Sequence, residues 1–98
     1  MVVAAPAPPP NFLQRKERRA RRALLQRDIA RIEGEVATLE VTLASIDVTF
    51  ADPGYYQRAP REQLEGDVQR QRDLKSRLAA ALDEWTHATS ELEALPDN

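Results

Sequence analysis

The sequence predicts an all-α protein, an antiparallel two-helix coiled-coil hairpin preceded by a disordered proline-rich segment. Hydrophobic residues between Leu25 and Phe50 recur at alternating steps of four and three, the 3.5-residue repeat of a helix that needs a partner along its whole length. A second hydrophobic stretch follows an Asp-Pro-Gly turn, so we expect the partner helix to lie in the same chain. The first repeat consists of Leu25, Ile29, Ile32, Val36, Leu39, Leu43, Ile46 and Phe50.

The composition agrees with long helices around a narrow core. The 98 residues are 31% charged and only 5% aromatic, which suits helices better than a sheet sandwich. The lack of cysteine excludes disulfides and thiolate metal sites. No apolar run approaches the ~18 residues that span a membrane, and the first residues lack the features of a secretory signal. We therefore expect a cytoplasmic protein with no membrane partner.

Residues 1–11 are rich in alanine and proline, a composition that favours extended polyproline-like backbone and supplies no core. We interpret this segment as a disordered interdomain linker, so that the chain is one domain, over residues 12–96, of a longer protein. Asn11 is expected to cap the following helix, because its side-chain oxygen can accept a hydrogen bond from an amide of the first turn.

The first helix is predicted over residues 12–50. Extended backwards from Leu25, its hydrophobic repeat places Arg22, Arg18 and Arg15 toward the partner helix, whereas a neighbouring stripe is hydrophobic. We therefore predict that the repeat shifts by about one residue where the two stripes meet, and that pairing weakens there. The neighbouring stripe consists of Leu13, Ala20 and Leu24.

A turn is predicted over residues 51–60, because Asp52-Pro53-Gly54 interrupts the helix. Tyr55 and Tyr56 could stack on nucleic-acid bases, but we favour packing over the end of the hairpin. Pro60 suits the first position of the second helix.

The second helix is predicted over residues 61–95. If the turn centres near Tyr55, the numbers of paired residues sum to about 110, and Leu25 meets Trp85 in the core, with the indole N–H pointing outward. This pairing matches hydrophobic residues with one another, except for Leu39 opposite Gln71. It favours a monomeric hairpin over a parallel dimer. The hydrophobic face of the second helix consists of Leu64, Val68, Leu74, Leu78, Leu82, Trp85, Leu92 and Leu95.

The charge is divided unevenly along the chain. Residues 11–31 hold eight Lys or Arg and two acids, a net charge of +6, whereas residues 32–98 carry a net charge of -8. A helical surface of guanidinium groups can contact a phosphate backbone at several points and release counterions. We predict binding to DNA or ribosomal RNA without base readout. The candidate binding residues are Arg15, Lys16, Arg18, Arg19, Arg21, Arg22 and Arg27.

The alternative interpretation of this cluster is solvated or internally paired charge. The predicted pairing brings Arg19 near Glu91, so that Glu91, Glu93 and Asp97 could neutralise part of the cluster. A second set of cations is scattered among acids and is interpreted as weak surface pairing. It consists of Arg58, Arg61, Arg70, Arg72, Lys75 and Arg77.

No residue pattern points to catalysis. His87 is the single histidine, and neither metal-ligand spacing nor a phosphate-binding glycine loop is present. We expect a non-catalytic domain with no cofactor, metal or small-molecule substrate. The alternative function is a protein-interaction or spacer coiled coil, acting as a homodimer or through ribosomal proteins.

The chain resembles the C-terminal coiled-coil domain of ABC-F ATPases of the Uup type over roughly residues 12–95. Leu13-Gln14-Arg15-Lys16-Glu17 is similar to the opening Leu-Ser-Tyr-Lys-Glu of that domain. Ala51-Asp52-Pro53-Gly54-Tyr55-Tyr56 is similar to its turn, and Trp85 with Glu91-Leu92-Glu93 to its closing motif, with a wider spacing here. The resemblance implies a cytoplasmic, ribosome-associated or DNA-binding ATPase whose two ATP-binding cassettes lie outside this chain.

Overall fold

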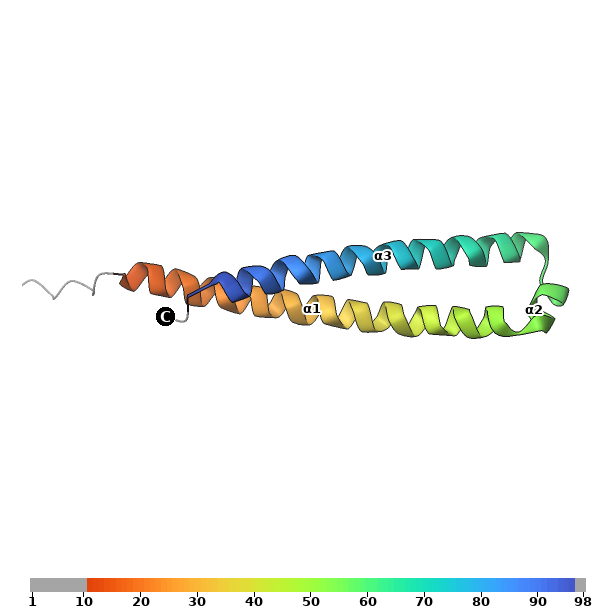
Figure 1. Ribbon diagram of the computed structural model, residues 1–98, viewed down its shortest axis with the longest axis horizontal. Helices are drawn as coiled ribbons and strands as arrows, with labels where there is room; N and C mark the ends of the chain where they lie inside the picture. The colour runs from red at the N-terminus through yellow and green to blue at the C-terminus, as the bar shows by residue number, and fades with distance from the viewer. Residues whose placement is uncertain (1–10, 97–98) are drawn as a thin grey trace, which may run out of the picture.

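The computed structural model describes residues 11–96, which form two long antiparallel helices joined by a short one (Figure 1). The two long helices pack against each other, which confirms the predicted all-α helical hairpin. None of these helices combines the length and hydrophobicity that a membrane crossing requires. The helices are α1 (Phe12–Ala51), α2 (Pro53–Arg58) and α3 (Arg61–Ala94).

The proline-rich segment predicted to be disordered lies outside the described residues, except for Asn11. Asn11 precedes α1 in the left-handed backbone region, with φ 77°, which asparagine tolerates better than most residues. Its side chain makes no capping hydrogen bond, so the predicted side-chain cap is wrong. The Asn11 backbone oxygen instead accepts a hydrogen bond from the Arg15 amide at 2.8 Å.

The predicted hydrophobic repeat of α1 forms its side of the core. Leu25, Ile32 and Leu39 lie seven residues apart and are almost completely buried, because a 3.5-residue repeat returns to the same face of the helix every two turns. Leu43 and Ile46 are also buried. The remaining residues of the repeat, Ile29, Val36 and Phe50, pack against this cluster while partly exposed.

The core face of α3 is partly the predicted one, since Leu74 is buried and Leu78, Leu92 and Leu95 pack against the core. Leu74, Ala81 and Ala88 are its buried residues, and their spacing of seven shows that α3 keeps the same strict repeat as α1. Bulky residues next to this line were predicted to be core, but Trp85 is 37% exposed. Two alanines occupy core positions that sequence reasoning assigned to larger side chains. Val68 and Leu82, which belong to the same predicted face, are also exposed.

The pairing of α1 with α3 is shifted by several residues from the prediction. The Trp85 indole N–H donates to Glu33 at 3.1 Å, and the Gln71 side-chain amide donates to Asp47 at 3.1 Å. The numbers of these partners sum to 118 rather than about 110, so Trp85 does not lie opposite Leu25. The connection between the two long helices contains a short helix, α2, where the sequence predicted only a turn.

The hydrophobic repeat does not shift near Leu24, in contrast to the prediction. Leu13 and Leu24 are exposed, whereas Arg15, Arg18 and Arg22 are half-buried and continue the line of Leu25 toward the start of α1. Long arginine side chains can occupy such positions because their aliphatic stems pack while the charged ends reach water. The basic segment therefore belongs to the same continuous helix as the core.

The turn is fixed by side-chain capping and by aromatic packing. The Asp52 carboxylate accepts from the Gly54 amide at 2.9 Å and from Arg58 at 3.1 Å. Pro60 lies one residue before α3 rather than at its first position, and its carbonyl oxygen accepts from the Leu64 amide. Tyr55 packs over the end of the hairpin as predicted.

Tyr55 is buried, and its ring centre lies 5.8 Å from that of Phe50. Its hydroxyl donates a hydrogen bond to the Asp67 carboxylate on α3. Asp67 occupies a half-buried position facing α1, where a hydrophobic residue would be expected. Tyr55 therefore supplies a hydrogen-bond donor to the half-buried carboxylate of Asp67.

We predict that Leu39→Ala lowers the free energy of unfolding by about 2–5 kcal/mol, because it leaves a cavity at a side chain that is only 3% exposed. Val41→Ala is the matched control two residues away, where the side chain is 71% exposed, and should change it by about 0.5 kcal/mol or less. Urea unfolding followed by circular dichroism measures both. Equal effects of the two substitutions would contradict the assigned core.

The hydrogen bond to Asp67, together with desolvation, raises the pKa of Tyr55 to about 12, from the ordinary value of 10.0. A raised pKa in the folded state means that this stabilisation is complete below about pH 10 and is lost as the pH rises through about 12. The stability difference between the wild type and Tyr55→Phe should therefore be constant from pH 8 to 10 and then shrink. Urea midpoints across this range test it, and a difference that stays constant to the highest pH would refute the assignment.

Candidate nucleic-acid interface

The cation cluster lies where α1 runs past the end of α3. Arg22 donates a hydrogen bond to the carbonyl oxygen of Pro96, which follows the last residues of α3. The part of α1 before Arg22 therefore extends beyond its partner helix, and Figure 1 shows this red-to-orange start of α1 projecting past the blue end of α3. A cationic helix segment that extends past the described end of its partner helix can approach a large, flat or grooved partner.

Two arginines of the cluster are held by the end of α3. Arg21 forms an ion pair with Glu91, and Arg22 binds the Pro96 carbonyl. A cation at the C-terminal end of a helix is favourable because the helix dipole is negative there. Arg18 also has an interaction within the protein. These contacts fix the base of the projecting segment against α3.

The predicted neutralisation by acids of α3 is therefore partial. Glu91 pairs with Arg21 rather than with Arg19. Glu93 takes part in no ion pair between described residues, and Asp97 lies outside them. Both members of the Arg21–Glu91 pair are more than half exposed, so a stronger anion can compete for the guanidinium group.

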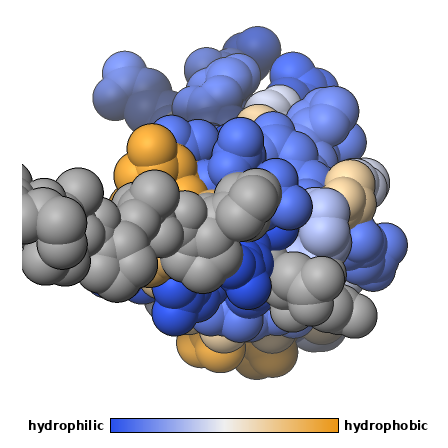
Figure 2. All heavy atoms as spheres, turned by 90° about the vertical axis from the view of Figure 1, so that its left-hand side faces the viewer, coloured by the Kyte–Doolittle hydropathy of each residue, from blue (hydrophilic) through white to orange (hydrophobic). Residues whose placement is uncertain are grey.

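The remaining cations of the cluster have no acid partner among residues 11–96. Lys16, Arg19 and Arg27 are exposed and Arg15 is half-buried, and none of the four takes part in an ion pair with a described residue. The first turn of α1 also contains no acid, so its positive helix end adds to the positive charge. Seen from this end, the visible surface is mostly hydrophilic with separate hydrophobic patches (Figure 2).

The second set of cations does not form a comparable cluster. Arg58 pairs with Asp52 at 3.1 Å and Arg61 with Glu65 at 3.0 Å, as expected for weak surface pairing. The others alternate with acids and uncharged residues around α3 and make no ion pair within the described part of the chain. These others are Arg70, Arg72, Lys75 and Arg77.

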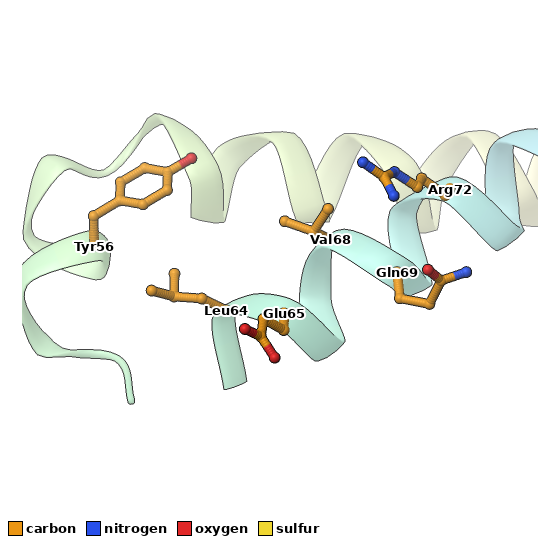
Figure 3. A pocket seen from close by; sticks show the side chains of 6 residues that line it. All are labelled: Tyr56, Leu64, Glu65, Val68, Gln69 and Arg72. Carbon is orange, nitrogen blue, oxygen red and sulfur yellow. The ribbon is translucent and has the colours of Figure 1, made fainter. Parts of the chain in front are cut away.

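A groove at the opposite end of the rod was not foreseen from the sequence. It has a volume of about 450 Å³, and its residues come from both α2 and α3 (Figure 3). Tyr56 and Arg72 lie on either side of a hydrophobic floor that contains Leu64 and Val68. The sequence singled out Tyr56, Leu64, Val68 and Arg72 for other reasons, but it did not show that the turn brings Tyr56 beside the other three. No group of three or more possible metal ligands occurs among residues 11–96.

Comparison with protein-family models, curated proteins and solved structures finds no match to this chain. The resemblance to the ABC-F C-terminal domain therefore rests on the residues quoted above.

We predict that Glu91→Gln changes the free energy of unfolding by less than about 1 kcal/mol, because the ion pair that it breaks is largely exposed to water. Glu93→Gln is the matched control, since it removes the same charge two residues away without breaking an ion pair between described residues. Urea unfolding measures both variants. A loss of several kcal/mol specific to Glu91→Gln would show that this pair is a main support of the hairpin.

Proposed function

We propose that this domain binds nucleic acid through the phosphate backbone, at the projecting basic end of α1. The observation that supports this most is the concentration of cations there: residues 11–31 have a net charge of +6, and Lys16, Arg19 and Arg27 are exposed and form no ion pair with a described residue. The rest of the chain carries a net charge of -8 and repels a polyanion, which confines the contact to this end.

The binding mode follows from the chemistry of the side chains. Arginine and lysine on several sides of one helix contact phosphate groups without needing a particular base sequence. Each contact releases condensed counterions, so affinity depends strongly on salt. The proposed partner is DNA or ribosomal RNA. The contact residues are Arg15, Lys16, Arg18, Arg19, Arg21, Arg22 and Arg27.

We further propose that the chain is the C-terminal domain of a cytoplasmic ABC-F ATPase of the Uup type. The helical hairpin, with the Asp52-Pro53-Gly54 motif at its turn, supports this. In this proposal ATP is bound and hydrolysed by cassette domains outside the chain, and the hairpin itself is non-catalytic. A single hairpin carries the whole cation cluster, so one copy suffices for binding.

Protein–protein interaction is a second candidate function, favoured by a different part of the surface. Val41 and Val48 are 71% and 73% exposed, and their positions in the repeat lie opposite the buried line of α1.

The affinity for duplex DNA is predicted to fall linearly with salt on a log–log plot, with a slope of about -0.9 for each phosphate contacted. Fluorescence anisotropy with a labelled duplex, single strand and ribosomal RNA hairpin across a salt series measures the slope for each ligand. A slope near zero would contradict backbone binding.

The combined substitution of Arg18, Arg19, Arg21 and Arg22 by Ala should abolish DNA binding and leave the helicity unchanged. The matched control replaces Arg70, Arg72, Lys75 and Arg77 by Ala, which removes the same charge from the middle of α3. It should retain binding, because those residues lie away from the projecting end. Equal losses in the two variants would show that only total charge matters.

A further inference from the structure

The side of α1 that faces away from α3 is an uncovered surface with hydrophobic residues. Val41 is 71% exposed and Val48 73%, and Leu24 on the same side is also exposed. Figure 1 shows no described element beside this lower side of α1, and Figure 2 shows hydrophobic residues, in orange, along its lower edge. Val41 and Val48 lie seven residues apart, so they form one line along the outside of the coiled coil.

This outer face of α1 carries no acid between residues 20 and 51. The acids of that segment, which include Asp28, Glu35 and Glu40, lie at positions of the repeat that flank α3. The outer face is therefore small or hydrophobic except for two arginines. It consists of Ala20, Ala23, Leu24, Arg27, Ala30, Arg31, Gly34, Ala37, Thr38, Val41, Ala44, Ser45, Val48 and Ala51.

Gly34 lies in the middle of the outer face, on the same line as Val41. Glycine inside a helix is less favourable than alanine. A Cβ atom at Gly34 would meet nothing within 4 Å, so no contact inside the hairpin requires a glycine there. The missing side chain leaves a shallow hole beside an exposed valine.

We propose that a second copy of this chain packs antiparallel on the outer face of α1, giving a four-helix bundle with two-fold symmetry. In this arrangement Val41 of each copy lies over Gly34 of the other, and the numbers of facing residues sum to about 75. Ala37 and Thr38 then lie at the symmetry axis, where small side chains let the two helices approach closely. Facing residues i and j exchange roles between the copies, as a two-fold interface requires.

Charge selects the antiparallel direction. A parallel pair would place Arg27 on Arg27 and bring together two ends that each carry a net charge of +6. The antiparallel pair places Val48 opposite the stem of Arg27 and sends the two basic ends to opposite ends of the bundle. Arg31 is drawn toward α3 by Asp28, Glu35 and Glu84, which leaves the centre of the face uncharged.

The size of the face indicates a weak dimer. The overlapping residues, 24–51, extend about 42 Å along a helix about 10 Å wide, or about 400 Å² per copy. Interfaces of this size belong to transient complexes. We therefore expect dissociation constants in the range of roughly 10–500 μM.

The chemistry of the face favours a helix over a lipid bilayer or a polyanion. Helices that lie on membranes present Trp, Phe and Leu with many cations around them, whereas this face presents mainly Ala, with two Val and one Leu. Arg27 and Arg31 are its only cations. The proposal does not depend on nucleic-acid binding, because the residues before Leu24 project beyond the overlap.

Sedimentation equilibrium from 10 μM to 1 mM tests the self-association. The average mass should rise from 11.1 kDa toward twice that value. Val41→Asp and Val48→Asp should weaken the association at least tenfold. Leu13→Asp, at another exposed residue on the same line but outside the overlap, should not. A wild-type protein that stays monomeric, or equal effects of all three substitutions, would overturn the proposal. The salt dependence of the affinity for DNA should be the same for Val41→Asp as for the wild type.

Disulfide cross-linking tests whether the two copies pack antiparallel. The sequence contains no cysteine, so only the introduced cysteine can form the cross-link. Ala37→Cys should form a disulfide between copies under oxidising conditions, because the residue lies at the symmetry axis. Val48→Cys should not, since antiparallel copies of it would lie about 31 Å apart. Efficient cross-linking of Val48→Cys would show a parallel pair and refute the proposed arrangement.

Co-sedimentation with phosphatidylserine vesicles tests the lipid alternative. The wild type and Val41→Asp should bind equally, through the basic end alone or not at all. Vesicle binding that depends on Val41, with a monomer in solution, would assign the outer face to a membrane surface and overturn the dimer.

Discussion

The structure depends on the burial of one line of α1 side chains against α3. Leu25, Ile32 and Leu39 supply the hydrophobic bulk, and Ala81 and Ala88 supply room for it on the other helix. This division of large and small side chains keeps the two helices close over a long distance with few aromatic residues. The buried line also allows α1 to begin with a charged segment, because the packing of Leu25 and later residues against α3 stabilises the helix that this segment continues.

The two ends of the rod differ, because one is closed by the turn and the other is open. At the turn, Asp52 caps α2 and Tyr55 joins the aromatic cluster while binding Asp67 on α3. At the other end, α3 stops first and Arg21 and Arg22 hold its last residues. Lys16, Arg19 and Arg27 form no ion pair with a described residue. The closed end suits a structural role, and the open basic end suits contact with a polyanion.

The fold was largely predictable, because a strict repeat over eight hydrophobic residues and a clear turn leave few alternatives. The pairing of the helices was not, because a hydrophobic repeat matches hydrophobic residues in more than one alignment and the path of the connection cannot be read from the sequence. Trp85 was placed in the core as part of the hydrophobic face of the second helix, whereas Ala81 and Ala88 are the buried residues in that part of α3. The hydrophobic stripe that includes Leu13 and Leu24 led to the prediction that the repeat shifts near Leu24. The repeat does not shift, because half-buried arginines continue it and the stripe stays exposed. The candidate binding residues were chosen from the distribution of charge along the sequence. That distribution does not show that Arg21 pairs with Glu91 or that Arg22 binds the Pro96 carbonyl.

Mapping the DNA contact by nuclear magnetic resonance tests the central claim most directly. Titration of a short duplex into the labelled domain should shift backbone signals of residues 12–27 and of the last turn of α3. Signals around Leu39 and Leu74 should remain in place, because the hairpin stays paired while the basic end binds. Shifts centred on the middle of α3, or no shifts at low salt, would contradict the account.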